Sequence, residues 1–450
     1  MKARKQRRWQ PRILRTLSLL GAILPGIIFS AANAKAHSKE ETLSAKDRKE
    51  VFERIWKDVD EKYYDPKFNG VNWEDVRTRY EPKVALVKDD EEFYNLMKQM
   101  VEELHDAHTR FNTPNEWKNR EKHQGVSLGF GVEQIEGKTV VNFVRPESEA
   151  ESKGIKLGMV VQTLDGQPVA ELLAASKNKR ERNSSERADM LLAYRDIFSG
   201  PVDSTLKLGL QRADGSTFET SVTRTIYALP PKVEGKLLPS GNGYIRFDEF
   251  ETGIARQFKD ELEKLRNAPG LVIDLRNNGG GTLDSMLALA EDLLPESTLF
   301  AEDRTRSGKP LSEFFGLSKV DLELHAGKAG KQVYAGPVVI LVKSRTASAS
   351  EIYAAGMQDN GRARIIGTQT CGCVLGIVKN RRTKGGGVLE ISEILWLTPK
   401  GRKLEGEGVL PDREVSPTIA DLQRRRDVVL EAAEQNLREM AQEQQARRQQ

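Results

Sequence analysis

The chain has 450 residues, of which 70 are Lys or Arg, 66 are Asp or Glu and 38% are hydrophobic. This length is too great for one ordinary hydrophobic core, so it predicts two or three domains. Two cysteines exclude a disulfide-dense scaffold, and the sequence has no basic stripe interleaved with aromatic residues of the kind that binds nucleic acid.

The first 34 residues have the three parts of a secretory signal peptide. Seven Lys or Arg residues come first, an apolar run from Leu17 to Phe29 follows, and small residues lie around Ala32. The apolar run is shorter than the roughly 20 residues that cross a bilayer. We therefore expect residues 1–34 to be a signal peptide and the mature chain to be exported to a periplasmic or extracellular compartment, with membrane contact only through an uncleaved signal. Without those seven residues, 63 Lys and Arg remain against 66 Asp and Glu, so the charge of the whole chain does not indicate a nucleic-acid partner.

Residues 38–115 are predicted to form a helical region. Ser44 is placed to cap one helix and Asp89 or Asp90 to cap a second, and apolar residues then recur at helical spacing. Residues 114–124 are polar and carry no apolar period, so we interpret them as a linker. The inward faces of the two helices would consist of Val51, Ile55, Val59 and Tyr63 in the first and of Phe93, Leu96, Met97, Met100, Val101 and Leu104 in the second.

Residues 124–228 change character, because short runs of β-forming residues separated by turn-like glycines replace the helical pattern. Within this stretch, residues 171–200 are highly charged and are interpreted as a solvated helix, with a movable cover as the alternative. The predicted strands are Val126–Val132, Thr139–Val144, Met159–Leu164, Leu206–Leu210 and Phe218–Val222.

From about residue 240 onward, short apolar strands alternate with helices, which is typical of an α/β domain. Leu271–Leu275 runs into a turn of three glycines, and Val338–Val342 is followed by Ser348 and a helix. Arg364–Ile366 is a third strand. The tail from Thr418 onward is predicted to be helical.

Three segments together resemble the C-terminal processing, or tail-specific, serine peptidases. TASASEI at residues 346–352 is similar to the nucleophile segment of that family, and LVIDLRNNGGG at 271–281 is similar to its strand and glycine turn. SLGFG at 127–131, with GIKLGM at 154–159, resembles a PDZ carboxylate loop and its following strand. The resemblance implies a multidomain α/β fold with an N-terminal helical region at 38–115, a PDZ-like β domain at 124–228, a crotonase- or ClpP-like α/β serine peptidase core at 238–416 and a C-terminal helical tail at 417–450.

The resemblance makes Ser348, the middle serine of its segment, the candidate nucleophile rather than Ser350. It would lie after a buried strand at the start of a helix, where free N–H groups favour negative charge. The N–H of Ala349 and one N–H from Gly279 or Gly280 would then form an oxyanion hole. A plain helix cap for the serine and a plain tight turn for the glycines are the alternatives.

The chain departs from the family pattern at the catalytic lysine of many members, because Cys373 occupies that position. A thiol with an ordinary pKa near ~8.5 is a poor replacement base. The stretch around His108 resembles the site that supplies a catalytic histidine in the tricorn branch, and Glu405 matches that branch's glutamate. The resemblance therefore implies Ser348, His108 and Glu405 as nucleophile, base and orienting carboxylate, with His105 as a backup base.

The missing lysine leaves a second explanation open, in which peptidase activity is lost and the PDZ-like domain makes the chain a binding or adaptor protein. A thiol-dependent enzyme and an acyl-CoA enzyme of the crotonase type are further alternatives. Cys371 and Cys373 would close only a very small ring, so we interpret Cys371 as a replacement for an apolar core residue. No cofactor and no metal are expected, since none of the five histidines has metal-ligand spacing with the cysteines.

The PDZ-like segment also implies a partner. Backbone N–H groups of Leu128, Gly129, Phe130 and Gly131 would bind the terminal carboxylate of an extended peptide, which would add a strand to the sheet edge. The expected partners are proteins or peptides with free C-termini, and the expected function is an endopeptidase that cleaves them near those ends.

Overall fold

The computed structural model describes residues 42–178, 183–308, 311–313, 318–320 and 323–449. The predicted signal peptide at 1–34 lies outside the described residues. Among the described helices, none combines the length and apolarity needed to cross a lipid bilayer.

The N-terminal described residues are helical, and both predicted caps are confirmed. The side chains of Ser44 and Asp89 accept backbone N–H groups in the first turns of α1 and α3. The predicted inward faces of both helices are buried in one hydrophobic cluster, to which a third helix, α2, contributes. The elements of this region are α1 (Ala45–Lys62), η1 (Phe68–Gly70), α2 (Trp73–Val84), α3 (Asp90–Glu102) and β1 (Arg110–Asn112).

The linker expected at residues 114–124 is wrong over most of its length, because helix α4 (Pro114–Glu121) occupies it. Thr113 and Glu116 form a capping box, and Pro114 stands at the first helical position. No residue of α4 is buried, so the helix carries no apolar period from which it could be detected.

Residues 124–228 contain a six-stranded antiparallel sheet of order β3-β4-β5-β7-β8, with β6 beside β5, and a separate pair, β2 and β9. The predicted strands are confirmed, except that the run from Val126 to Val132 is two strands divided at Gly129, whose φ is +79°. Helices α6 and α7 lie within the charged stretch. The elements are β2 (Gln124–Ser127), β3 (Phe130–Ile135), β4 (Lys138–Val144), α5 (Glu149–Ser152), β5 (Val160–Leu164), β6 (Gln167–Pro168), α6 (Val169–Asn178), α7 (Glu186–Phe198), β7 (Thr205–Gln211), β8 (Thr217–Thr223) and β9 (Thr225–Ala228).

A second six-stranded sheet, of order β10-β11-β12-β17-β18-β23, forms the centre of the remaining chain. Only β10 and β11 are antiparallel, and every later pair is parallel. The strand predicted at Val338–Val342 is confirmed with those bounds. The strands and the helices between them are β10 (Val233–Leu237), β11 (Gly243–Phe247), α8 (Ile254–Lys264), β12 (Leu271–Asp274), α9 (Leu283–Glu291), β17 (Val338–Val342), α10 (Ala349–Asp359), β18 (Ala363–Gly367) and β23 (Arg413–Glu414).

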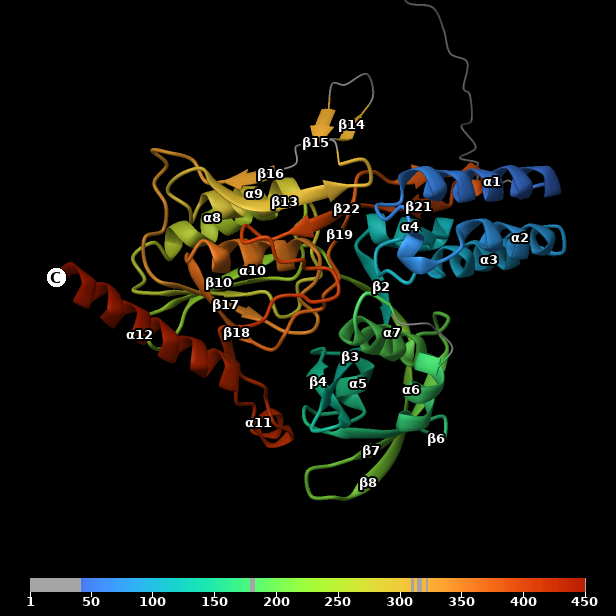
Figure 1. The fold of residues 1–450 in the computed structure, drawn as a ribbon. Helices are drawn as coiled ribbons and strands as arrows, with labels where there is room; N and C mark the ends of the chain where they lie inside the picture. Colours follow the sequence, from blue (N-terminus) through green and yellow to red (C-terminus); the bar gives the residue numbers. More distant parts are fainter. Residues whose placement is uncertain (1–41, 179–182, 309–310, 314–317, 321–322, 450) are drawn as a thin grey trace, which may run out of the picture. The chain divides into compact units, whose positions relative to one another are not determined.

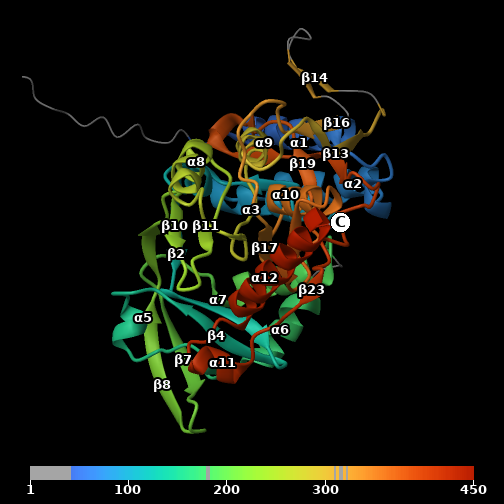
Figure 2. The same ribbon diagram turned by 90° about the vertical axis from the view of Figure 1, so that its left-hand side faces the viewer.

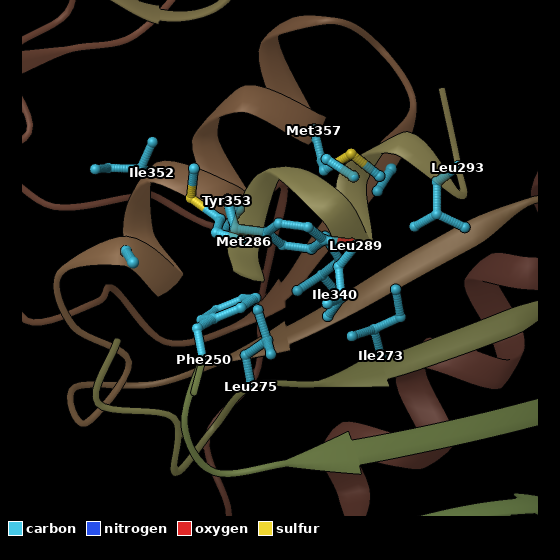
Figure 3. Packing of buried hydrophobic residues seen from close by; sticks show 14 of the residues in the cluster. Phe250, Ile273, Leu275, Met286, Leu289, Leu293, Ile340, Ile352, Tyr353 and Met357 are labelled. Atoms are coloured by element: carbon cyan, nitrogen blue, oxygen red, sulfur yellow. The ribbon is translucent and has the colours of Figure 1, made fainter. Parts of the chain in front are cut away.

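Both faces of this sheet are buried, as continuous apolar runs in parallel strands predict. Ile273 and Ile340 point to the side covered by α8, α9 and α10 (Figures 1 and 3), whereas Val272 and Val339 point to the side covered by α12. Because β12 and β17 are parallel neighbours, with Ile273 opposite Ile340, the loops that follow them emerge at the same edge. That edge holds both the glycine turn and Ser348.

The remaining elements join the core to the N-terminal helices and to the tail. Strand β1 pairs with β21, which ties the end of the helical region to the core. A four-stranded antiparallel sheet of order β16-β13-β22-β19 lies beside α10 and α9, and Figure 2 shows α12 crossing the central sheet. These elements are β13 (Thr298–Thr305), β14 (Leu311–Glu313), β15 (Ser318–Val320), β16 (Glu323–Ala326), β19 (Leu375–Ile377), β20 (Arg381–Arg382), η3 (Lys384–Gly386), β21 (Val388–Glu390), β22 (Ser392–Leu397), α11 (Ile419–Gln423) and α12 (Val428–Gln449).

Arg276 anchors the turn after β12 to the tail. Its guanidinium lies 2.6 Å from the buried carboxylate of Asp274 and 2.8 Å from that of Asp427, at the start of α12. Although burial alone would raise it, the pKa of Asp274 is held below its ordinary value by this arginine.

We expect Arg276→Ala to lower the free energy of unfolding by about 3 kcal/mol, because it leaves a buried carboxylate without its cation. Arg426→Ala, which breaks an exposed pair with Glu431, is the control and should cost less than about 1 kcal/mol. Urea unfolding followed by tryptophan fluorescence measures both values. Equal losses in the two variants would contradict the anchoring role of Arg276.

Candidate active site

The structure brings Ser348 and His108 together although they are 240 residues apart in sequence. The Nε2 atom of His108 lies 3.1 Å from the Oγ atom of Ser348. Ser348 stands directly before α10, and His108 lies in the loop that leads into β1. A hydroxyl within hydrogen-bonding distance of an imidazole is the arrangement that activates a serine for nucleophilic attack.

Ser348 has a backbone conformation that few residues other than glycine adopt, with φ at +58°. Such a conformation costs of order 1–3 kcal/mol and persists only where the surroundings enforce it. Its N–H donates to the carbonyl of Cys373 at 2.9 Å and to the carboxylate of Glu351 at 3.1 Å. Ser350, by contrast, is fully buried and donates to Asn278, so it has no access to a substrate.

The glycine turn packs directly against Ser348. A Cβ atom on Gly280, whose φ is +102°, would lie 2.7 Å from the Cβ atom of Ser348. The amides of both predicted glycines donate within the protein in this structure. Gly279 donates to the carbonyl of Asp248 and Gly280 to the side chain of Asn278. Within the described residues no partner is found for the N–H of Ala349.

The loop that carries His108 is held by a buried carboxylate. The Oδ1 atom of Asp106 accepts the N–H of His108 at 2.8 Å, the N–H of Thr109 at 2.6 Å and the hydroxyl of Ser392, in β22, at 2.8 Å. Desolvation of the imidazole lowers the pKa of His108 to about 4, and the charge of Arg110 acts in the same direction. The ring is therefore neutral at neutral pH, which is the protonation state that a general base needs.

Glu405 is buried, but the structure does not bring it to the imidazole of His108. Its Oε2 atom accepts the N–H of Val374 at 2.6 Å, and it accepts a hydrogen bond from Ser184. Ser184 in turn accepts the backbone N–H of Ala107, so this residue links Glu405 to the histidine loop. Burial raises the pKa of Glu405 to about 8, which makes its neutral form dominant at neutral pH.

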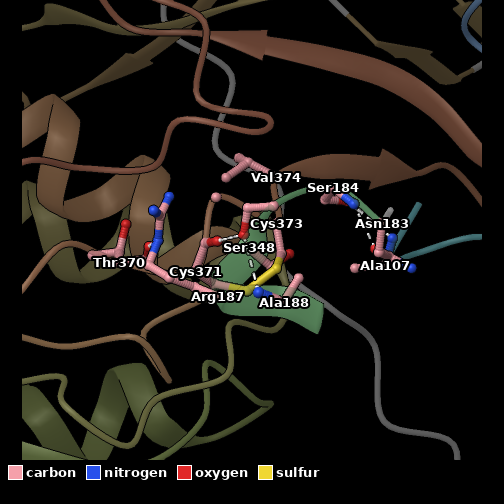
Figure 4. Close-up of a disulfide and its surroundings, with 12 residues drawn as sticks. Ala107, Asn183, Ser184, Arg187, Ala188, Ser348, Thr370, Cys371, Cys373 and Val374 are labelled. Atoms are coloured by element: carbon pink, nitrogen blue, oxygen red, sulfur yellow. Dashed lines mark hydrogen bonds between the residues drawn. A yellow bond between two sulfur atoms is a disulfide. The ribbon is translucent and has the colours of Figure 1, made fainter. Parts of the chain in front are cut away.

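Cys371 and Cys373 form a disulfide, which corrects our interpretation of Cys371 as a plain apolar replacement. Figure 4 shows this disulfide beside Ser348, with Ala188 of α7 packed against it. A single intervening residue, Gly372, at φ +71°, allows the chain to turn between the two cysteines. Position 373 therefore carries neither an amine nor a free thiol.

The N-terminal end of α7 docks on this disulfide loop. The Ser185 hydroxyl donates to the carbonyl of Cys371, and the Arg187 guanidinium donates to the carbonyls of Thr370 and Glu407. The solvated-helix interpretation of residues 171–200 is therefore wrong for this end of α7.

A pocket of about 660 Å³ adjoins the histidine loop. Its lining comes from α2, α3, the loop at 105–110 and α7, and it includes His105, the predicted backup base. Residues Asp106 and Ala107 form part of the same wall, so a bound chain in this pocket would lie next to the loop that presents His108.

The predicted carboxylate loop lies between β2 and β3. The N–H of Gly129 donates to the Ser127 hydroxyl at 3.1 Å, and its carbonyl accepts the N–H of Arg145 at 2.8 Å. Among the described strands, β3 pairs only with β4, so its second edge carries no strand. Leu128 and Phe130 are buried at the two ends of this loop, and Gly131 opens β3 beside Phe143.

Comparison with known proteins is consistent with this geometry. Residues 241–415 match the model of peptidase family S41, and residues 44–102 match that of the Tricorn protease C1 domain. Residues 241–415 therefore carry a peptidase family S41 domain. The chain is a serine peptidase that is similar to carboxyl-terminal-processing proteases.

Two curated relatives of this S41 peptidase cover most of both chains. The chloroplastic C-terminal processing peptidase of Tetradesmus obliquus is 29% identical over 82% of this chain and 77% of its own. The carboxyl-terminal-processing protease of Synechocystis sp. is 25% identical over 94% and 93%. Two solved structures share the fold: the photosystem II D1 C-terminal processing protease, 24% identical with a TM-score of 0.55 over 82% and 93% of the two chains, and mature CPAF, 15% identical with a TM-score of 0.64 over 88% and 96%.

Sequence reasoning missed two buried carboxylates of this S41 peptidase. Glu351 accepts four donors and holds the disulfide loop against Ser348, and Asp106 holds the histidine loop. Glu351 lies in the nucleophile segment, three residues after Ser348, and Asp106 lies two residues before His108. The signal in the sequence that could have identified these two carboxylates is their position close to Ser348 and His108.

Gly280→Ala should reduce peptidase activity by about a hundredfold or more, because the added Cβ displaces Ser348 and small misplacements of reacting groups have effects of that size. Gly215→Ala, in the turn between β7 and β8, is the matched control, since it adds the same methyl group at a glycine of positive φ where a Cβ meets nothing within 4 Å. We expect that control to stay within about twofold of the native kcat/KM, as exposed substitutions usually do. Similar activity in both variants would show that close packing on Ser348 does not matter.

Proposed function

We propose that this S41 peptidase cleaves proteins near their C-termini, with Ser348 as nucleophile and His108 as general base. The 3.1 Å contact between Ser348 Oγ and His108 Nε2 is the observation that carries the proposal. It supplies a base from the N-terminal region at a site where position 373 has no lysine. An inactive adaptor would have no need for such a contact.

The residues support a two-step acyl transfer. The neutral His108 takes the Ser348 proton as Oγ attacks the peptide carbonyl carbon, and it then gives that proton to the leaving amine. The N–H of Ala349, at the start of α10, stabilises the oxyanion, together with the positive end of the helix. Water, activated by the same histidine, then hydrolyses the acyl-enzyme. The N–H of Gly279 or Gly280 is the proposed second donor to the oxyanion. To act in this way, it must give up its present hydrogen bond within the protein and form one to the substrate.

In this proposal, each expected domain has its own role. Residues 38–115 carry His108, residues 124–228 form a PDZ-like module, residues 238–416 form the crotonase- or ClpP-like core that carries Ser348, and residues 417–450 form the helical tail. The strand-free edge of β3 and the loop at Leu128–Gly131 support peptide capture by strand addition. The basic and apolar character of residues 1–34 supports export of the mature chain.

Ser348→Ala and His108→Ala should each lower cleavage of an unstructured test protein by at least about a thousandfold, because each removes one member of the nucleophile–base pair. A Cys371→Ser, Cys373→Ser double variant tests the thiol-dependent alternative, and we expect it to retain cleavage because neither sulfur attacks the substrate. Mass spectrometry of the products measures all three variants side by side. Full activity of Ser348→Ala would overturn the proposal.

A peptide substrate with a free C-terminus should be cleaved with a lower KM than the same peptide carrying a terminal amide. Loss of a charge-assisted bond to backbone N–H groups costs about 1.5–3 kcal/mol, so the KM should rise by roughly ten- to a hundredfold. Steady-state kinetics on the two peptides give both values. Equal KM values would remove tail capture from the proposal and leave the chemistry at Ser348 untouched.

A further inference from the structure

Two buried polar atoms near the candidate base have no hydrogen-bond partner in the part of the chain that the structure describes. They are the Nδ1 atom of His108 and the Oδ2 atom of Asp106. If Nε2 of His108 is to accept the Ser348 proton, the neutral ring must carry its hydrogen on Nδ1. A buried N–H without an acceptor is strongly unfavourable, and more so once the ring is positively charged. The site therefore needs an acceptor for Nδ1–H.

Glu405, which the family resemblance assigns to this task, is poorly placed for it. Its carboxyl accepts hydrogen bonds from Val374 and Ser184, and none from the imidazole. Burial favours its neutral form, and the nearby charges of Asp106 and Glu351 act in the same direction. A neutral carboxylic acid held by other donors gives little stabilisation to an imidazolium ion.

Asp106 has the properties that Glu405 lacks. All three of its hydrogen bonds from the histidine loop and from Ser392 go to Oδ1. The buried Tyr63 hydroxyl also interacts with this carboxylate, and Oδ2 keeps the capacity to accept a further donor. Because Oδ1 binds the backbone N–H of His108 itself, the carboxylate is held next to the residue that carries the imidazole. The negative charge of Asp106 also favours the protonated form of His108.

The other charges around His108 largely offset one another. Arg110 and Arg120 oppose protonation of the ring, whereas Glu390 favours it. Both arginines are paired with Glu390, Arg110 at 2.5 Å and Arg120 at 3.0 Å. Asp106 is therefore the acidic group that favours protonation of the His108 ring and takes no part in the ion pairs of Glu390 with Arg110 and Arg120.

We propose that Asp106, rather than Glu405, is the positioning residue of the catalytic histidine: it holds the His108 loop through Oδ1 and accepts the Nδ1–H of His108 through Oδ2, directly or across one water. This inference rests on the proposed roles of Ser348 and His108. In the step itself, the Ser348 O–H bond breaks, the proton moves to His108 Nε2, and Oγ bonds to the substrate carbonyl carbon. The Asp106 carboxylate stabilises the imidazolium that forms.

The test compares two carboxylate-to-carboxamide variants, Asp106→Asn and Glu405→Gln, in the otherwise native chain. Asn keeps a side-chain oxygen that can accept the three hydrogen bonds now made to Oδ1, so we expect the loop to stay folded. Thermal unfolding of the variant checks this. We expect Asp106→Asn to lower kcat by about a hundredfold or more with little change in KM, since loss of an orienting carboxylate has effects of this size in serine peptidases. The acid limb of its kcat/KM profile should move to lower pH, because a charge that favours protonation of His108 is gone.

Glu405→Gln should keep kcat within about threefold of the native value at neutral pH, because glutamine resembles the neutral acid already present. A second readout that does not depend on turnover is the NMR titration of the His108 ring, whose midpoint should fall in Asp106→Asn and stay unchanged in Glu405→Gln. Near-native kcat and an unmoved titration in Asp106→Asn would overturn the inference, as would a loss in Glu405→Gln as large as that in Asp106→Asn. If Ser348→Ala and His108→Ala are inactive while Asp106→Asn is active, the proposed function stands and only this inference fails.

Discussion

The buried carboxylate of Glu351 is the interaction on which the arrangement around Ser348 depends. It is fully buried, and it accepts the N–H of Ser348, the hydroxyl of Thr370 and the N–H groups of Gly372 and Cys373. One side chain on the first turn of α10 thus joins the nucleophile, the end of the central sheet and the disulfide loop. Burial raises the pKa of Glu351 to about 7, although its four hydrogen-bond donors act to lower it. Burial and hydrogen bonding therefore have opposite effects on the charge of this carboxylate. The strained φ of Ser348 is sustained by this set of bonds together with the glycine turn.

The second half of the site depends on a connection between distant segments. Strand β1 pairs with β21, and Ser392, two residues beyond β21, donates to Asp106 and lies 3.1 Å from the Thr109 hydroxyl. The histidine loop is therefore built partly from the core, although His108 belongs to the N-terminal helical region in sequence. Because both halves are anchored to strands of one core, the 3.1 Å distance between His108 and Ser348 is set by rigid elements rather than by a free loop.

The sequence pattern predicted those parts of the molecule that have strong local signals. Val338–Val342 is a continuous apolar run and was assigned with its observed bounds, and Ser44 and Asp89 cap helices because short polar side chains satisfy free N–H groups. The Ser348–His108 pair came from the family resemblance, since no local period links residues 240 positions apart.

The parts that escaped prediction lack such local signals. Helix α4 has caps but no buried face, so an apolar period could not show it. The disulfide forms because Gly372 allows the chain to turn at a positive φ, which the spacing of the cysteines alone does not reveal. The Ser184 partner of Glu405 and the internal bond from Gly279 to Asp248 are tertiary contacts between residues far apart in sequence. The bond from Gly280 to Asn278 is local, but it depends on the conformation of the glycine turn.

The disulfide leaves position 373 without an amine or a free thiol. With Cys373 bonded to Cys371, its side chain offers neither a proton acceptor nor a nucleophile, but its backbone carbonyl still accepts the Ser348 N–H at 2.9 Å. The backbone of this segment therefore holds Ser348, the proposed nucleophile, while its side chain takes no part in the proposed chemistry. The proposed base, His108, comes from a different segment of the chain. An imidazole gains a positive charge when it takes the serine proton, so a neighbouring carboxylate stabilises the state that forms in the proposed reaction. Asp106, two residues before the histidine, is the carboxylate proposed for this role.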